Sequence, residues 1–264
     1  MTVTAPDGAT AGARVAGDRG PALIFVHGVG STASIWDAQL AAFGDAYRCA
    51  AIELRGNGAL PDPAPSSITR EGFADDVLAI ANARGADRFT LVGCSLGGVV
   101  AFELWKRVPE RFETMVIVGS FARYPDGQAY ADGVKAAARE AGDMRAFATS
   151  RAAKLGLPPE RLRETIDQMA VKSVDCYLAS TQATWTGDYR DVLPTIGVPA
   201  LVLCGERDAV APRALSEEIA RGIPAARFAS VAGAGHVANA DAPSRFNELL
   251  REFLQRDAQK GSLL

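Results

Sequence analysis

Two side chains that can act as nucleophiles, Cys94 and Ser95, lie next to each other in the stretch LVGCSLGGVV at residues 91–100. The five residues GCSLG fit the pattern Gly-X-Ser-X-Gly, in which a serine occupies a sharp turn between a strand and a helix. The same pattern centred on cysteine would need glycine at positions 92 and 96, where the chain has valine and leucine. We therefore predict that Ser95 is the nucleophile and that Cys94 is a small packed side chain.

A serine hydroxyl is a poor nucleophile at neutral pH, so it needs a general base, and histidine is the side chain suited to that role. The chain has two histidines, His27 in FVHGVG and His236 in VAGAGHVAN. A carboxylate that orients the histidine is also required. The segment ALVLCGERDAVAP supplies two candidates, Glu206 and Asp208. These residue types together indicate acyl transfer through a covalent ester of the serine.

Short apolar segments precede several of these motifs, as expected for the strands of a buried parallel sheet. Helical patterns alternate with them, which predicts a parallel sheet covered by helices on both faces. The strand-like segments are residues 22–26, 47–52, 89–93, 115–119, 200–204 and 227–231. The helical segments are residues 33–43, 69–84, 96–108, 213–223 and 242–256.

The alternation stops between residues 121 and 190, which carry helical patterns but no strand-like segment. The helical patterns cover residues 130–153, 160–170 and 174–186. We predict that this part is a helical cap inserted into a core made of residues 1–120 and 191–264. Segments of this kind usually cover pockets.

Composition excludes several other classes of protein. Of the 264 residues, 48% are apolar and the net charge is −3, which is the balance of an ordinary soluble protein. No basic stripe indicates nucleic-acid binding, and no apolar run approaches the roughly 18 residues of a membrane span. The start of the chain lacks the pattern of a secretory signal, and four cysteines without metal or disulfide spacing predict free thiols. We expect a cytoplasmic protein that meets neither membranes nor nucleic acid; its oligomeric state stays open.

Five motifs in the same order as in the α/β-hydrolase superfamily run through nearly the whole chain. They are FVHGVG at 25–30, ELRGNG at 53–58, VGCSLGG at 92–98, CGERDAVAP at 204–212 and GAGHVANADAP at 233–243. The sequence therefore resembles this superfamily, and in particular its small esterases and enol-lactone hydrolases, which carry a compact helical cap. The resemblance implies a mostly parallel central sheet flanked by helices.

The resemblance also implies a role for each candidate residue. Ser95 would be the nucleophile, His236 the general base, and Asp208 the carboxylate that orients the base. The backbone N–H groups of Val29 and Leu96 would form the oxyanion hole. No cofactor or metal is expected, and the substrate would be a small ester or lactone.

Some residues near the motifs have a structural interpretation. The superfamily uses the position of His27 to shape its loop, so we expect no proton transfer there. Trp185, at the end of the cap, either packs or lines the substrate pocket. Where relatives usually have aspartate and later serine, this chain has Glu53 and Leu60, which puts the shape of that loop in doubt. The segment at residues 9–17 is short for the opening strands, so the first edge of the sheet is expected to be small.

Two other functions stay open beside ester or lactone hydrolysis. A related branch of the superfamily uses the same triad to cleave carbon–carbon bonds in dienoic diketo acids, and it needs a cationic group for the substrate carboxylate. Arg123, at the mouth of the cap, is a candidate for that group, although a solvated surface arginine is the simpler interpretation. A non-catalytic binder of small molecules is the third possibility, and an intact triad argues against it.

Overall fold

The computed structural model describes residues 1–153 and 159–261. Its centre is an eight-stranded sheet with the spatial order β1-β2-β4-β3-β5-β6-β7-β8. The strands are β1 (Thr2–Thr4), β2 (Thr10–Ala16), β3 (Ala22–Val26), β4 (Arg48–Glu53), β5 (Phe89–Cys94), β6 (Phe112–Val118), β7 (Ala200–Gly205) and β8 (Ala226–Val231). From β4 to β8 neighbouring strands are parallel, whereas β1 and β2 pair antiparallel at one edge.

The predicted strands are confirmed to within a few residues at each end, because five of the six are apolar and largely buried on both faces. The two strands at one side of the sheet, β1 and β2, have a weaker apolar pattern than the central strands. Three consecutive residues of the seven in β2, Ala11 to Ala13, are buried, whereas Arg14 and Val15 in its second half are exposed. A half-exposed edge strand carries less apolar signal than a central one, and this explains why the sequence predicted only a small edge here.

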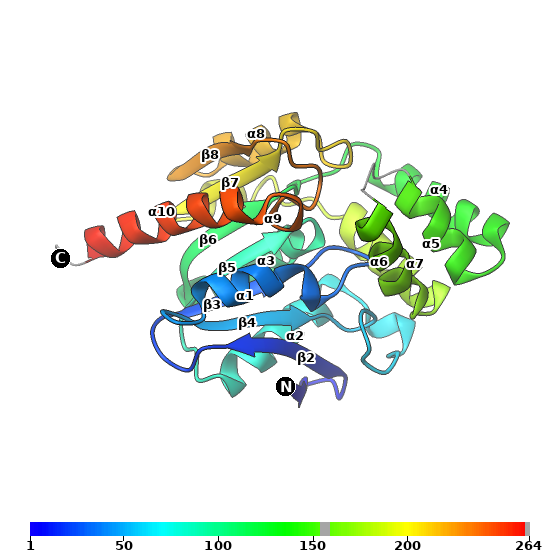
Figure 1. The fold of residues 1–264 in the computed structure, drawn as a ribbon, viewed down its shortest axis with the longest axis horizontal. Coiled ribbons are helices and arrows are strands. Elements are labelled where there is room, and N and C mark those ends of the chain that lie inside the picture. The colour runs from blue at the N-terminus through cyan, green and yellow to red at the C-terminus, as the bar shows by residue number, and fades with distance from the viewer. Residues whose placement is uncertain (154–158, 262–264) are drawn as a thin grey trace.

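Helices cover both faces of the sheet (Figure 1). One face packs against α2 (Arg70–Ala83), α3 (Leu96–Arg107) and α8 (Arg213–Gly222). The opposite face packs against α1 (Asp37–Phe43) and α10 (Pro243–Gly261). The shorter helices are η1 (Ala33–Trp36), η2 (Pro65–Ser67), η3 (Pro109–Arg111), η5 (Leu193–Thr195) and α9 (Ala238–Asp241). Within the described residues, no helix has the length and apolar character needed to cross a membrane.

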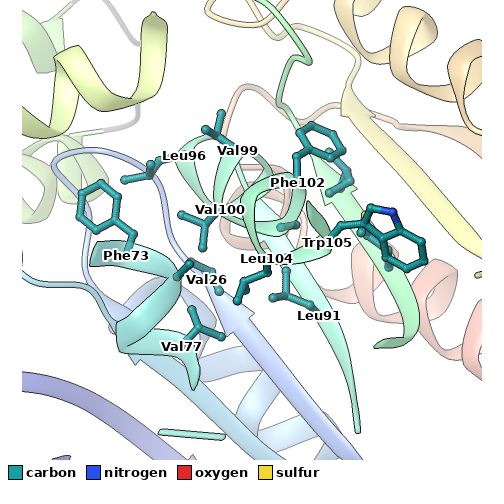
Figure 2. Packing of buried hydrophobic residues seen from close by; sticks show 14 of the residues in the cluster. Val26, Phe73, Val77, Leu91, Leu96, Val99, Val100, Phe102, Leu104 and Trp105 are labelled. Atoms are coloured by element: carbon teal, nitrogen blue, oxygen red, sulfur yellow. The ribbon is translucent and has the colours of Figure 1, made fainter. Parts of the chain in front are cut away.

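Helix α3 is buried over most of its length, because it lies between the sheet and its neighbouring helices. Figure 2 shows its apolar side chains packed against strand residues Val26 and Leu91 and against Phe73 and Val77 of α2. Buried side chains of this size each contribute roughly 1.5–3 kcal/mol to stability. The helix that follows Ser95 is therefore held firmly against the core.

The inserted segment between β6 and β7 is helical, as predicted. It contains α4 (Gly127–Ala141), α5 (Met144–Ala152), α6 (Pro159–Ala170) and α7 (Val174–Trp185), which group at one end of the sheet (Figure 1). The prediction of one helix over residues 130–153 is wrong. Gly142 adopts a φ of 78°, which ends α4, and the Asp143 carboxylate accepts the Ala146 N–H at 2.9 Å, which caps α5.

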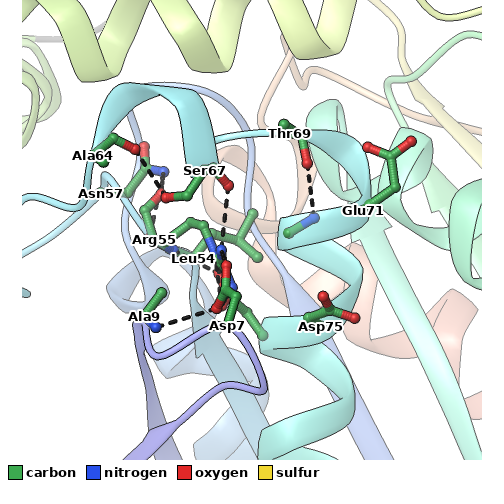
Figure 3. Close-up of polar contacts among 12 residues, drawn as sticks. Asp7, Ala9, Leu54, Arg55, Asn57, Ala64, Ser67, Thr69, Glu71 and Asp75 are labelled. Carbon is green, nitrogen blue, oxygen red and sulfur yellow. Dashed lines mark hydrogen bonds and ion pairs between the residues drawn. The ribbon is translucent and has the colours of Figure 1, made fainter.

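A buried ion pair attaches the N-terminal strands to the loop that follows β4. The side chains of Arg55 and Asp76 are both fully buried, and Arg55 Nη2 donates to Asp76 Oδ1 at 2.7 Å. Arg55 also pairs with Asp7, from the turn between β1 and β2 (Figure 3). Removing one member of such a buried pair typically costs about 3–5 kcal/mol. This network fixes the loop that follows β4, which also contacts the inserted helices.

Candidate active site

Ser95 occupies the turn between β5 and α3 in a strained backbone conformation. Its φ is 54° and its ψ is −112°, and its side chain is buried. A non-glycine residue rarely adopts a positive φ, and such strain clusters at functional sites. The flanking glycines make the turn possible: a Cβ at Gly93 would lie 2.2 Å from the Gly97 carbonyl oxygen, and one at Gly97 would lie 2.3 Å from that of Val26. There is therefore no room for a side chain at either glycine, as the sequence pattern predicts.

Hydrogen bonds from neighbouring elements hold the Ser95 backbone in this conformation. Its N–H donates to the Val118 carbonyl at 2.9 Å, at the end of β6. Its carbonyl accepts the Ser120 hydroxyl at 2.7 Å and the Gly98 N–H at 2.9 Å. The sequence analysis did not single out Ser120, because no motif connects it to the turn. Its position one residue beyond the glycine that follows β6 is the only sequence signal for it.

His236 and Asp208 form a hydrogen-bonded pair although 28 residues separate them. His236 Nδ1 lies 3.0 Å from Asp208 Oδ1 and 2.9 Å from Oδ2. The carboxylate also accepts the N–H groups of Val210 and Ala211, both at 2.9 Å, so its orientation is fixed. Because a carboxylate only accepts hydrogen bonds, Nδ1 must carry the proton, which leaves Nε2 as the basic nitrogen.

The rival carboxylate in the same turn has a different partner. Glu206 Oε2 accepts the N–H of Gly233 at 2.9 Å, which ties together two loops at the carboxyl end of the sheet. The structure therefore brings Asp208 to His236 and directs Glu206 to the backbone. The sequence order that favoured Asp208 agrees with this geometry.

Ser95 and His236 line the same cavity. Within the described part of the chain, no hydrogen bond joins the Ser95 hydroxyl to the His236 ring. Catalytic hydrogen bonds of this kind are often long without substrate and shorten when it binds. The serine and the histidine are thus placed at one cavity, and the Asp208 carboxylate orients the histidine ring.

The amides of Val29 and Leu96 are available as hydrogen-bond donors. Among the described residues, neither N–H has a protein acceptor. The loop that carries Val29 approaches Ser95 closely, since a Cβ at Gly28 would lie 3.1 Å from Ser95 Cβ. Leu96 begins α3, where free N–H groups and the helix dipole favour negative charge. Both predicted donors therefore lie beside Ser95.

His27 is fully buried and is bonded to the backbone on both sides of its ring. Nδ1 donates to the Gly28 carbonyl at 2.8 Å, and Nε2 accepts the N–H of Leu54 at 3.2 Å. These bonds join the loop after β3 to the loop after β4. The structural role expected for His27 agrees with this arrangement.

Cys94 is packed beneath the turn as predicted, with 1% of its surface exposed. Burial raises the pKa of its thiol far above the ordinary value, and the nearby Asp208 carboxylate adds to the effect. A thiol in this state is a weak nucleophile because the thiolate is the reactive form. All four cysteines are buried and free. In the described ranges, no three His, Cys, Asp or Glu side chains form a metal-binding group.

The cavity has a volume of about 380 Å³ and lies between the sheet and the inserted helices. Its wall on the helical side is rich in aromatic residues. Trp185 lines it, as one of the two interpretations of this residue proposed, and its ring stacks on Tyr130 at 4.8 Å between centroids. Tyr124 and Tyr177 also line the cavity. A pocket of this size and character suits a small organic substrate.

Two arginines that the sequence analysis did not identify, Arg151 and Arg161, also line the cavity. The helical pattern of α5 and α6 gave no reason to select them among many surface arginines. Arg123, the candidate that the sequence offered, is half exposed, and its Nε lies 4.0 Å from an Asp188 carboxylate oxygen. Its interpretation as a surface residue therefore agrees with the structure.

The loop that differs from the superfamily pattern is accommodated locally. Both carboxylate oxygens of Glu53 lie 3.3 Å from the N–H of Ala33, so the longer acid reaches the start of η1. The Leu60 carbonyl accepts a hydrogen bond from Lys172, in the turn between α6 and α7. Neither of these contacts involves Ser95 or His236.

Comparison with known proteins gives a consistent picture. Residues 21–243 match the family described as alpha/beta hydrolase fold. The chain is 29% identical to 3-oxoadipate enol-lactonase 2 of Acinetobacter baylyi, with 89% of both chains covered. It is 30% identical to the putative carbamate hydrolase RutD of Azorhizobium caulinodans, over 89% of this chain and 91% of that protein. The solved structure of a thermophilic esterase from Thermogutta terrifontis superposes with a TM-score of 0.85, at 26% identity over 97% of this chain and 98% of that one. Fold, motif order and family match agree, and the chain belongs to the α/β-hydrolase family.

Proposed function

We propose that this hydrolase cleaves a carboxylic ester or a lactone through an acyl-enzyme intermediate. In the first step, His236 Nε2 removes the proton of the Ser95 hydroxyl while its oxygen attacks the substrate carbonyl carbon. The amides of Val29 and Leu96 bind the oxyanion, each stabilising the transition state by about 3 kcal/mol. The tetrahedral intermediate then collapses, and His236 returns the proton to the departing alkoxide.

In the second step, water releases the acid. His236 Nε2 takes a proton from the water as it attacks the acyl carbon, and gives it to the serine oxygen when the acyl bond breaks. Asp208 stays ionised throughout and stabilises the imidazolium that forms in both steps. A lactone follows the same course, but its leaving oxygen, protonated by His236, stays on the acyl chain as a hydroxyl group, so water releases a single open hydroxy acid.

One observation carries this proposal: a strained serine and a histidine oriented by a carboxylate line one cavity, next to two backbone amides that have no acceptor among the described residues. The relatives support the class of substrate, since their names describe an enol-lactonase, an esterase and a putative carbamate hydrolase. A carbamate carbonyl is attacked by the same chemistry, so it belongs in the substrate panel. We also assign residues 121–190 to the cap and residues 1–120 and 191–264 to the core.

The experiment is a kinetic comparison of the wild-type enzyme with Ser95→Ala. A panel of p-nitrophenyl esters of graded chain length, several lactones and a carbamate gives kcat/KM for each substrate. We expect measurable hydrolysis of at least one ester or lactone, lowered by at least about 10³-fold in Ser95→Ala. Circular dichroism and thermal melting check that the variant folds. Equal activity in a folded Ser95→Ala would exclude the proposed nucleophile.

Carbon–carbon cleavage of a dienoic diketo acid is the second candidate. It needs a cationic group for the substrate carboxylate, and the structure places Arg151 and Arg161 in the cavity wall, where the sequence identified none. The same preparation therefore has to be tested on a ring-fission product. Rapid cleavage of that compound, with no activity on the ester, lactone and carbamate panel, would replace the leading proposal by this one.

A further inference from the structure

Two arginines contribute positive charge to the cavity wall, Arg161 and Arg151, and they differ in whether a carboxylate pairs with them. Arg161 Nη1 lies 3.0 Å from Glu164 Oε2, so a carboxylate of its own helix pairs with it. Arg151, near the end of α5, has no such partner among the side chains that the structure describes. Among the side chains that the structure describes, no carboxylate oxygen lies within the 4.0 Å limit of an ion pair with its guanidinium.

Phenol groups surround Arg151 in place of carboxylates. Its Nη2 donates to Tyr130 Oη at 2.7 Å, and the guanidinium carbon lies 5.6 Å from the centroid of the same ring. Tyr177, which is buried, is the other phenol close to it. Burial raises the pKa of Tyr177 above the ordinary value, so this phenol stays neutral at physiological pH. The phenols position the guanidinium without neutralising it.

A guanidinium is always charged and has five N–H donors in a planar fork. In the described structure the hydrogen-bonding partners of Arg151 are two phenols, Tyr130 at 2.7 Å and the adjacent Tyr177, so most of these donors face no acceptor there. Keeping a partly buried charge without a counter-charge is costly, and the cost is recovered when an anion binds. The two donors of one fork edge match the two oxygens of a carboxylate, which gives a bidentate pair.

We propose that Arg151 binds a carboxylate of the substrate, so that the preferred substrates are esters or lactones that carry a free acid group. This inference rests on the proposed function of the same cavity. Tyr130 holds the guanidinium in place, and its stacking on Trp185 connects this anion site to the aromatic wall of the cavity. The reacting carbonyl lies at Ser95 and the acid group at the cap, so Arg151 determines specificity without taking part in bond cleavage.

Two pairs of substrates differ only in the presence of the carboxylate. Mono-p-nitrophenyl adipate and p-nitrophenyl hexanoate have the same leaving group and the same six-carbon acyl chain. 4-Acetoxybenzoate and phenyl acetate place the difference on the alcohol side. For the wild-type enzyme we expect kcat/KM to be at least about 10-fold higher for the anionic member of one pair, which is the effect of a charge-assisted hydrogen bond.

The variants are Arg151→Gln, Arg151→Lys and the control Arg145→Gln. In Arg151→Gln the ratio of the two kcat/KM values should fall by about 10- to 100-fold, mainly through KM. Arg151→Lys keeps the charge but loses the planar fork, so it should recover part of the ratio. Arg145 belongs to the same helix, is largely exposed and pairs with Asp167 at 2.9 Å. Its substitution removes the same charge and should leave the ratio as in the wild type.

The outcomes separate this inference from the proposed function. If the wild-type enzyme cleaves the neutral esters as well as the anionic ones, and Arg151→Gln leaves the ratios unchanged, the anion site is disproved while ester hydrolysis stands. If the enzyme cleaves neither member of either pair and no other ester or lactone, the proposed function itself fails. The wild-type comparison decides the question even if an Arg151 variant does not fold.

Discussion

Strain at Ser95 and orientation at His236 are the two residue-scale features on which the proposed chemistry depends. A positive φ at a non-glycine residue costs on the order of 1–3 kcal/mol, and here it is held by the hydrogen bond that Ser95 donates to Val118 and the one that it accepts from Ser120. The strained turn places the Ser95 side chain at the carboxyl end of β5 and the start of α3, where it lines the cavity. Asp208 fixes the ring of His236, so that the basic nitrogen is ready before the substrate binds.

Asp208→Asn tests this orientation. An asparagine side chain can still accept the N–H groups of Val210 and Ala211, but its NH₂ group would face His236 Nδ1 and favour the wrong tautomer. We expect kcat to fall by on the order of 10³- to 10⁴-fold on the best substrate of the ester and lactone panel. The matched control is Glu206→Gln, from the same turn, because a glutamine oxygen can still accept the Gly233 N–H. Similar losses in both variants would contradict the assignment of Asp208.

At this scale the sequence predicted the residues that belong to motifs and missed those that do not. Glycines around Ser95 and the order of the motifs pointed to the serine, the carboxylate and the histidine. Ser120 and Arg151 act through contacts between segments far apart in the chain, so no local pattern identifies them. An arginine that lines a cavity has the same sequence signature as one on the surface.

At the scale of elements, the close approach of α3 to the sheet positions the nucleophile. The first turn of this helix lies so near β3 that a Cβ at Gly97 would meet the Val26 carbonyl at 2.3 Å. The rest of the helix packs into the core through large apolar side chains (Figure 2). Helix, turn and strand therefore form one rigid support for Ser95.

Gly97→Ala tests the close approach, with Gly133→Ala as its control. Both glycines lie in helices, but the space around Gly133 is open and the residue is exposed. We expect Gly97→Ala to lower the free energy of unfolding by about 2 kcal/mol or more, since backbone atoms have to move. Gly133→Ala should raise it by about 0.5–1 kcal/mol, because alanine favours the helix. Urea unfolding measures both. Equal effects of the two substitutions would show that α3 does not need glycine at this contact.

Predictions for the elements were most accurate where burial produces a continuous apolar pattern. The central strands are buried on both faces, and their bounds followed from the sequence to within a few residues. The break between α4 and α5 was missed because alanine-rich helical patterning continues on both sides of Gly142. Here a single glycine with positive φ, together with the Asp143 cap, overrides the periodicity.

At the scale of the whole molecule, a sheet built from distant segments brings its loops to one edge, and the inserted helices complete a cavity over them. The family and the layered architecture followed from motif order and from the alternation of strands and helices, and the family match confirms them. The shape and the lining residues of the cavity could not be predicted from the sequence, because its wall depends on how α4 to α7 pack on the carboxyl edge of the sheet. Substrate choice therefore lies in the part of the molecule that sequence patterns describe least well.

The most direct test of the serine mechanism is to identify the atom that becomes covalently modified. A p-nitrophenyl alkylphosphonate, which mimics the tetrahedral intermediate, is incubated with the wild-type enzyme, Ser95→Ala, His236→Ala and Cys94→Ala, and adducts are mapped by intact-mass and peptide mass spectrometry. We predict a single adduct on Ser95 in the wild type and in Cys94→Ala, none in Ser95→Ala, and much slower labelling in His236→Ala. An adduct on Cys94, or stoichiometric labelling that persists in Ser95→Ala, would contradict the mechanism.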